Sequence, residues 1–384
     1  MDVKQVYQFV NTATAEALGD SALVKEDLSN VVDVGAAVFD ANAQDAFVRS
    51  LVNHIGRVIC VDRAYKISTP SLLKEGWEFG SCLEKLQVEL PDAEENESWE
   101  LQDRTAYDPN LFYKSVVTAK FFNKKCTLEI PLSITEKQVK QSFSNATQLN
   151  AFISMLYQNV QNSLTVKLDA LAMRLVNDAI AESFYAEVGS SSISSRSGNK
   201  TVNLLYLYNQ RFGTSLSAAN AITNKDFLTF ATYTMSVYAD RMTRMSKLFN
   251  IDAKARFTPA DKRKCILLSE FAKAIGPYAK APIYNQEYIN LPDAETVPYW
   301  QGSGQGYGFA DTAKVYCTTA SGHDITATGV LGVMFDNDAM MICNEDNRTT
   351  TYYNPKGEFY NNWAKADVSE FLATDEQIIV FYVA

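Results

Sequence analysis

The feature that most constrains the fold lies between residues 83 and 188. Apolar residues alternate with polar ones in two segments, and an acidic stretch over 91–110 separates them. The first segment carries Leu86, Val88 and Leu90; the second carries Cys126, Leu128, Ile130, Leu132 and Ile134. This two-residue period predicts a pair of strands. The second strand then leads, after a short polar break, into a helical pattern. A chain that folds alone has no need of a long arm beside a long helix, so this layout favours a subunit that reaches onto a neighbouring copy.

Charge divides the predicted arm into a negative and a positive limb. The stretch before and around the tip contains Asp92, Glu94, Glu95, Glu97, Glu100, Asp103 and Asp108 against the single Arg104. The next residues contain Lys114, Lys120, Lys124 and Lys125 and no acid. One interpretation is a solvated hairpin whose charges have no partner. The other is charge complementarity to a neighbouring copy, which fixes register more than affinity.

Candidate subunit contacts follow from the second interpretation and from two aromatic residues in a later glycine-rich loop. They are Glu94, Glu95, Glu97, Trp99, Arg104, Lys114, Lys120, Lys124, Lys125, Trp300 and Tyr307.

The helical pattern begins near a possible capping box at residues 145–148 and ends before Gly189. Its apolar face consists of Leu149, Phe152, Ile153, Leu156, Val160, Leu164, Leu168, Leu171, Leu175 and Ala179. About forty residues at a rise of 1.5 Å predict a helix of roughly 60 Å. A coiled coil is disfavoured because strict heptads are not sustained and strands flank the helix.

The regions before the arm predict smaller elements. An amphipathic helix is predicted from Val3 to Leu18, before Gly19. The polar, alanine-rich stretch after it is expected to lie over the surface as an extended arm without a core of its own. A second helix is predicted from Gln44 to Ile55, with Phe47, Val48 and Leu51 on its apolar face, followed by a strand over 57–61.

The region after the long helix predicts a mixed unit. We expect a helix that begins at Thr223-Asn-Lys-Asp226 and runs to Phe249, with Met242 and Met245 on one side. A strand over 264–269 and a short helix from Ser269 are expected after it. An aromatic, glycine-rich excursion follows over 281–310. A strand then turns at residues 336–338, and a terminal strand over 377–383 is expected to close an earlier sheet.

Composition excludes several classes of protein. The net charge of −10 and the pI of about 4.9 argue against a dedicated nucleic-acid binder, which needs a basic surface. The start lacks the features of a secretory signal, and no apolar run reaches the length of a membrane span, so we expect a soluble protein made in a cytoplasm. The six cysteines lie far apart without a CxxC pair, which favours free buried thiols over disulfides or zinc.

No constellation of residues predicts catalysis, a metal or a cofactor. His54 lies on an apolar helix face and His323 in a loop, and neither belongs to a GxSxG pattern. The glycine-rich loop over 302–308 lacks the GK[ST] ending of a phosphate-binding loop. Residues 336–338 resemble part of a calcium loop, but the glycine and distal glutamate are missing. We therefore expect a structural protein and not an enzyme.

The order of these features resembles the major capsid proteins of tailed bacteriophages, which share the Johnson (HK-ninety-seven-like) fold. Several segments are most similar to the small podoviruses of the phi-twenty-nine type. They are residues 45–56, the acidic loop before 111–113, the helix opening at 150–154, and residues 333–338 followed by 354–357. Each motif is weak alone, and their shared order over nearly the whole chain carries the resemblance.

The resemblance implies an α+β fold in four parts. These are an N-terminal arm and first helix (1–65), an extended E-loop hairpin (66–134), a peripheral domain with a long spine helix (135–200 and 346–384), and an axial domain (201–345). It also implies copies arranged as pentamers and hexamers in an icosahedral or elongated shell of the virion, assembled in the host cytoplasm. A scaffolding protein and a portal are the implied partners. Double-stranded DNA would be enclosed without sequence-specific binding.

Three other classes of protein fit the sequence less well. An encapsulin-like bacterial nanocompartment has the same fold but needs a groove for a cargo peptide, which no segment indicates. A soluble enzyme would need a catalytic constellation, and a tail or adhesion protein would show fibrous β repeats.

Overall fold

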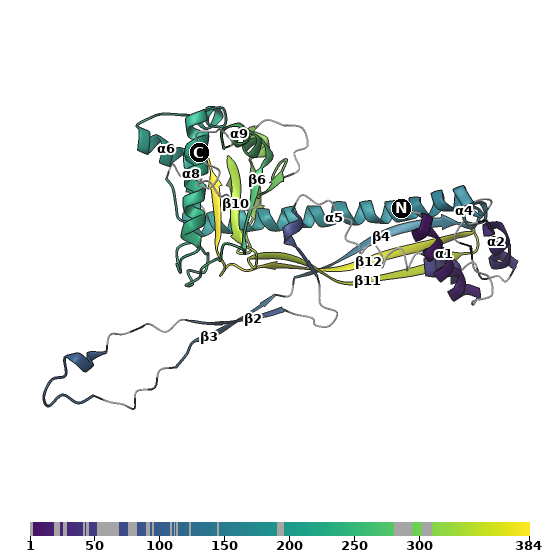
Figure 1. Ribbon diagram of the computed structural model, residues 1–384, viewed down its shortest axis with the longest axis horizontal. Helices are drawn as coiled ribbons and strands as arrows, with labels where there is room; N and C mark the ends of the chain where they lie inside the picture. The colour runs from purple at the N-terminus through teal and green to yellow at the C-terminus, as the bar shows by residue number, and fades with distance from the viewer. Residues whose placement is uncertain are drawn as a thin grey trace. The chain divides into compact units, whose positions relative to one another are not determined.

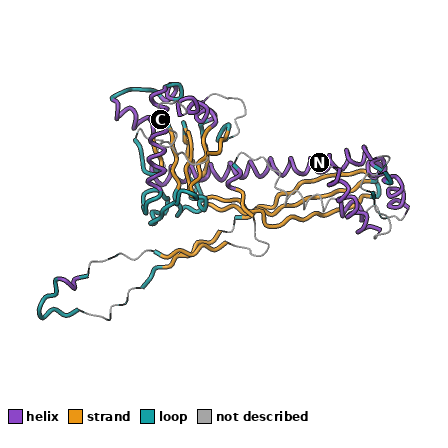
Figure 2. Tube along the Cα trace, in the orientation of Figure 1, coloured by secondary structure: helices purple, strands orange, loops and turns teal. Residues whose placement is uncertain are grey.

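The computed structural model of the chain contains two compact units. It describes residues 3–18, 24–25, 29–40, 43, 46–51, 69–75, 83–89, 93, 96–107, 110, 112, 114–122, 124–143, 146–189, 196–279, 294–301 and 309–384. Unit 1 comprises Met1–Glu78, Lys124–Leu175 and Met341–Glu370. Unit 2 comprises Phe79–Asn123, Val176–Met340 and Phe371–Ala384. The mixture of helices and strands (Figure 2) confirms the expected α+β class.

A four-stranded sheet forms the centre of unit 1. Its strand order is β1 (Leu73–Glu75), β11 (Met340–Asn354), β12 (Phe359–Leu372) and β4 (Lys125–Thr135). Strand β1 is parallel to β11, and β12 is antiparallel to β4 over eleven residue pairs, Phe359↔Thr135 to Ser369↔Lys125. Along β4 the side chains alternate between exposed and half-buried, as expected for a sheet with one solvated face.

Short helices accompany this sheet. They are α1 (Val3–Leu18), α2 (Val31–Asp40), the 3-10 helix η1 (Pro70–Leu72) and α4 (Glu136–Ser142). Thr135 begins α4 with a capping box that also involves Gln138. Residues 46–51 are helical, with Phe47, Val48 and Leu51 buried, which confirms that part of the predicted helix; the rest of it, His54 and the strand over 57–61 lie outside the described residues.

Helix α5 (Ala146–Val188) confirms the predicted long helix at almost the same bounds. Nine of the ten residues named for its apolar face are buried, and Phe152 is half-buried. Toward its C-terminal end additional residues are buried, namely Ala172, Val176, Ile180, Ala181 and Phe184. A single stripe at 3.6-residue spacing does not cover these positions, so this end of α5 is enclosed on more than one side.

A five-stranded sheet forms the core of unit 2 (Figure 1). Its order is β5 (Thr201–Asn203), β13 (Ile378–Tyr382), β10 (Val330–Asp336), β6 (Arg263–Leu268) and β7 (Ala294–Val297). The predicted terminal strand is confirmed as β13, and it lies inside the sheet, parallel to β5 and antiparallel to β10. Every residue of β10 and β13 is buried.

The remaining elements of unit 2 are mostly helices. They are α6 (Leu204–Phe212), α7 (Ala218–Ala221), α8 (Lys225–Met242), α9 (Ser269–Ala279) and α10 (Phe309–Thr312), with the hairpin β8 (Val315–Thr318) and β9 (Asp324–Ala327). Strand β6 and helix α9 confirm the elements predicted at 264–269 and from Ser269.

Two sequence predictions about helices are wrong. The stretch expected to drape after the first helix contains α2, whose Val31, Val34 and Val38 are buried at helical spacing. Gly35 in α2 lies so close to Phe143 that an added Cβ would come within 2.5 Å of its ring.

Helix α8 ends at Met242 and not at Phe249, so Met245 is exposed on the following loop. Tertiary hydrogen bonds replace the helix there: Thr258 N donates to Met242 O, and residues 246 and 256 form a β-bridge.

The arm is a two-stranded ribbon with a long connection. Strand β2 (Leu83–Val88) pairs antiparallel with β3 (Val117–Phe122), and the connection includes the 3-10 helix η2 (Glu97–Trp99). This corrects the predicted pairing of the arm, because β4 joins the sheet of unit 1 instead. The residues of the ribbon belong to unit 2.

Candidate subunit-contact surface

The ribbon has an apolar face whose large side chains are exposed in the described part of the chain. In an antiparallel pair, directly paired residues point to the same side, and the side alternates along the strand. The register Leu86↔Ala119 and Val88↔Val117 therefore places these four side chains, together with Phe121, on one face, which we call the outer face. Leu86 is 67% exposed and Phe121 is 61% exposed. Exposed apolar patches of this kind mark interaction surfaces.

The tip of the arm exposes larger aromatic residues. Trp99 is 96% exposed and Phe112 is 87% exposed. The backbone around them is held by local contacts, in which Ser98 N donates to Asn96 Oδ1 at 2.8 Å and Gln102 N donates to the Tyr107 hydroxyl at 3.2 Å. The side chain of Arg104 extends into solvent at 3.8 Å from Asp103, and Arg104 has a positive φ of 64°. The tip thus presents aromatic and charged side chains outward.

The opposite face of the ribbon is basic and is bound to its own unit. Lys85 pairs across the strands with Lys120, so two like charges face each other. Lys85 Nζ lies 2.7 Å from Asp375 and 2.5 Å from Glu376. Lys120 Nζ lies 3.1 Å from Asp252 and 3.8 Å from Asp375. The carboxylates offset the repulsion between the lysines and attach both strands to unit 2.

Asp375 is the centre of this cluster, with a side chain only 1% exposed. Burial raises the pKa of its carboxyl, but the hydrogen bond and the charge of Lys85 outweigh burial and hold the pKa below its usual value. Arg256 lies 3.7 Å from both Asp375 and Glu376. We call Lys85, Lys120, Asp252, Arg256, Asp375 and Glu376 the ionic clamp.

Several of the candidate contacts predicted from the sequence have partners within their own chain. Lys120 belongs to the ionic clamp. Lys124 lies 2.8 Å from the buried Glu370, which also binds Arg174, and Lys125 pairs with Glu345. These lysines help to hold the chain together, so the positive limb of the arm is largely satisfied internally.

Trp300 is a core residue, and its prediction as a subunit contact is wrong. Its side chain is fully buried, and its Nε1 donates to Val330 O at 2.8 Å. Its backbone carbonyl accepts a hydrogen bond from Asn177 at 2.9 Å. A neighbouring copy therefore has no access to the ring.

The other candidates divide into exposed residues and residues outside the described part of the chain. Trp99, Arg104 and Lys114 are exposed, and Glu97 lies in η2. Glu94, Glu95 and Tyr307 lie outside the described residues. Sequence reasoning missed the outer face, although its signal was present in the alternation of Val117, Ala119 and Phe121.

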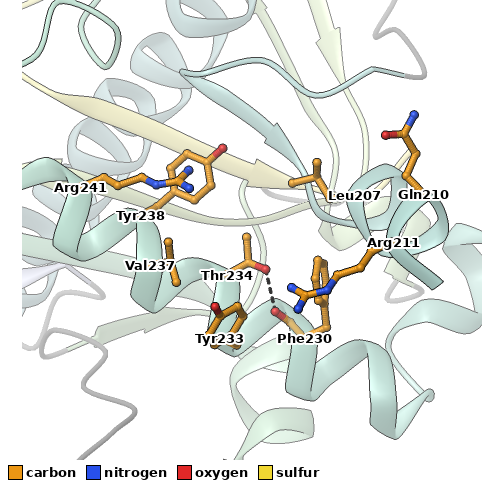
Figure 3. A pocket seen from close by; sticks show the side chains of 9 residues that line it. All are labelled: Leu207, Gln210, Arg211, Phe230, Tyr233, Thr234, Val237, Tyr238 and Arg241. Carbon is orange, nitrogen blue, oxygen red and sulfur yellow. Dashed lines mark hydrogen bonds between the residues drawn. The ribbon is translucent and has the colours of Figure 1, made fainter.

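A shallow groove between α6 and α8 carries two further cations (Figure 3). The Arg211 guanidinium lies 5.8 Å from the Phe230 ring and 5.9 Å from the Tyr233 ring. Arg241 lies over the Tyr238 ring at 4.8 Å. Arginines stacked on aromatic rings are typical of contact surfaces. The nine lining residues include no acid, cysteine or histidine that could act as a nucleophile or base.

Among the described residues, no group of three or more metal-ligating side chains could hold a metal ion. Burial and a 2.8 Å contact with Asp178 raise the pKa of the Cys317 thiol to about 12, and burial raises that of Cys265 to about 12, so neither forms a thiolate nucleophile. His323 stacks on Tyr185 at 4.6 Å in the β8–β9 turn. Among the described helices, none is long and apolar enough to cross a bilayer.

Solved structures share this fold at very low sequence identity. A chain described as the capsid structure of Staphylococcus phage Andhra matches with a TM-score of 0.52 and 11% identity, over 84% of this chain and 85% of that one. A chain from the structure of the head fiber and inner core protein gp22 of native bacteriophage P68 matches with a TM-score of 0.51 and 9% identity, over 84% and 86%. The fold is therefore the HK-ninety-seven-like fold of tailed-phage capsid proteins.

The sequence itself identifies the family. The model of the Phi29-like phage major capsid protein family matches residues 10–382, so the chain belongs to that family. A search of curated proteins gives no match. The chain is a major capsid protein of a tailed phage, located in the capsid of the virion, and copies of it form the shell. This confirms the family resemblance and the function expected from it.

Proposed function

We propose that the arm of each copy lies on a neighbouring copy and joins the two through its outer face and its tip. The observation that carries this proposal is the exposure of large apolar side chains along a ribbon whose other face is bound to its own unit. Burying one such side chain contributes about 1.5–3 kcal/mol. Burial of several such side chains against a neighbouring copy would therefore stabilise the contact. The residues available for it are Leu86, Val88, Val117 and Phe121 of the outer face and Trp99 and Phe112 of the tip.

A shell of this kind needs only modest individual contacts. Interfaces of obligate assemblies bury on the order of 2,000 Å² or more. Each subunit is held by several neighbours at once, and the resulting effective concentration makes weak contacts jointly strong. Contacts between different surfaces of identical copies close into rings. We propose pentamers and hexamers as these rings, in an icosahedral or elongated shell.

The four-part division of the chain is also a proposal. Residues 1–65 would form the N-terminal arm and first helix, 135–200 with 346–384 the peripheral domain with α5 as its spine, and 201–345 the axial domain. The E-loop, expected at 66–134, is better placed within 79–123, because β1 and β4 both pair in the sheet of unit 1.

The remaining partners follow from the role of a shell. We propose that a scaffolding protein and a portal direct assembly. The net charge of −10 suits a wall that encloses double-stranded DNA without gripping its phosphates. The role is structural and not enzymatic.

The contact of the arm can be tested by deletion and by a double substitution. Deletion of residues 92–109 and the pair Trp99→Ala with Phe112→Ala are each expected to leave a folded subunit that assembles poorly. Electron micrographs, with and without a scaffolding protein from the same phage, would count shells, and circular dichroism would check folding. Tyr352→Ala is the matched control, because Tyr352 is an exposed aromatic residue on β11 of unit 1.

Wild-type numbers of full-size shells from the deletion would overturn the proposal. An equal loss from Tyr352→Ala would show that the effect is not specific to the arm.

A further inference from the structure

We propose that Asp375 and Glu376 position the arm: through the ionic clamp they fix the direction in which the ribbon leaves unit 2, and so decide whether it meets a neighbouring copy. This inference rests on the proposed function only in that the arm is taken as the contacting surface. It assigns a task to residues on the side of the ribbon opposite that surface.

The clamp binds both strands of the ribbon at positions that pair directly with each other. Lys85 of β2 and Lys120 of β3 are direct cross-strand partners, and Asp375 contacts both of them. A contact to one strand alone would leave the ribbon free to rotate about that point. Two contacts from paired positions constrain rotation as well as displacement.

Hydrogen bonds hold together the two segments that carry the carboxylates of the clamp. Ile251 N and Asp252 N donate to Thr374 O at 2.9 and 3.1 Å, which joins the loop around 250–256 to the turn at 373–377. Gln377 Nε2 donates to Arg256 O at 2.9 Å, and its Oε1 accepts from the Thr258 hydroxyl at 2.9 Å. Strand β13 begins at the next residue, so the clamp is continuous with the middle of the buried sheet.

The charged groups around the clamp come from three segments and balance one another. The ribbon supplies Lys85, Lys120 and Glu89; the loop supplies Asp252, Lys254 and Arg256; the turn supplies Asp375 and Glu376. Lys254 pairs with Glu89 just beyond the end of β2 and extends the attachment along the ribbon.

The path of the chain explains why a clamp is needed. Beyond β3 the chain enters β4, which belongs to unit 1, and before β2 it comes from β1 of the same sheet. The ribbon is therefore covalently continuous with strands of unit 1 but bound by charge to the rest of unit 2. Without the clamp, the attachments of the ribbon to unit 2 that the structure shows are the Lys254–Glu89 ion pair and the contact between the Phe122 and Phe371 rings, whose centroids lie 5.7 Å apart.

Distance measurements on the unassembled subunit test this directly. Spin labels carried by non-natural amino acids would replace Ser98 in the tip and the exposed Ala219 in α7, both within unit 2. We expect a single narrow distance in the wild type. Lys85→Met with Lys120→Met should lose it and give a broad distribution, because both attachments are removed.

Two further variants make the test decisive. Lys262→Met removes an exposed ion pair of unit 2 with Asp338, 2.8 Å long, and should keep the narrow distance. Asp375→Asn with Glu376→Gln should broaden it like the lysine variant; if that protein fails to fold, the lysine variant, whose side chains are partly exposed, still decides. Shell counts for the lysine variant should fall while its melting temperature stays close to that of the wild type.

A narrow distance retained in the lysine variant would overturn the inference, as would equal broadening by Lys262→Met. Because the distance is measured before assembly, the result does not depend on whether the tip contacts a neighbouring copy. Normal shell formation after Trp99→Ala with Phe112→Ala would refute the proposed contact of the arm. It would not affect the inference that the clamp positions the ribbon.

Discussion

The five-stranded sheet of unit 2 and the β2–β3 ribbon use apolar residues in opposite ways. In the sheet, β10 and β13 are buried along their whole length. In the ribbon, Leu86, Val88, Val117 and Phe121 share one face and remain exposed. Both regions carry large apolar side chains on their strands. The difference lies in what covers these side chains: in the sheet they are covered by their own unit, and in the ribbon we propose that a neighbouring copy covers them.

The largest expected effect comes from the sheet. Phe381 on β13 is fully buried and meets Tyr238 edge to face, with ring centroids 5.9 Å apart. Phe381→Ala leaves a cavity and should cost about 3–5 kcal/mol of unfolding free energy. Urea denaturation followed by circular dichroism measures it. A loss below about 1 kcal/mol would contradict the view of β13 as the core of this unit.

A smaller effect is expected from protonating the clamp. The pKa of Asp375 is lowered in the folded state, so the stability it contributes is present above its unfolded pKa of about 3.9 and is lost as pH falls through the folded value. The narrow tip-to-α7 distance should therefore persist from pH 8 to about pH 5 and broaden only in stronger acid. Broadening already near pH 6 would show that another group controls the ribbon.

The smallest effect on stability should come from the outer face. Phe121→Ala removes an exposed side chain and is expected to change the unfolding free energy by no more than about 0.5 kcal/mol. The same substitution should reduce shell formation, since we propose that the ring packs against a neighbouring copy. A loss of unfolding free energy as large as that of Phe381→Ala would show that Phe121 is part of the core of its own subunit, and would contradict the difference between ribbon and sheet.

Elements with a sustained period could be predicted from the sequence. The spacing of Leu149, Leu156, Leu164 and Leu175 indicated α5 and the side it buries, and the alternation through Ile134 indicated β4. Such patterns depend on local geometry alone, which is why they transfer from sequence to structure.

Pairings between distant segments could not be predicted. Alternation states which face of a strand is apolar but not which strand lies beside it, so β4 was assigned to the arm instead of to β12. Lys85 and Asp375 are 290 positions apart, and no local signal links them. Trp300 lies beside a glycine-rich loop, which suggested exposure, yet Val330 O binds its indole nitrogen in the core.

The position of β13 in the chain also orders events during translation. Residues 374–382 contain the turn of the clamp and the strand between β5 and β10, and the ribosome adds them after every segment that they contact. A nascent chain therefore presents the ribbon before Asp375 and Glu376 have been added to it. If these two carboxylates fix the direction of the ribbon, as proposed above, the outer face meets another copy efficiently only after synthesis has passed this turn.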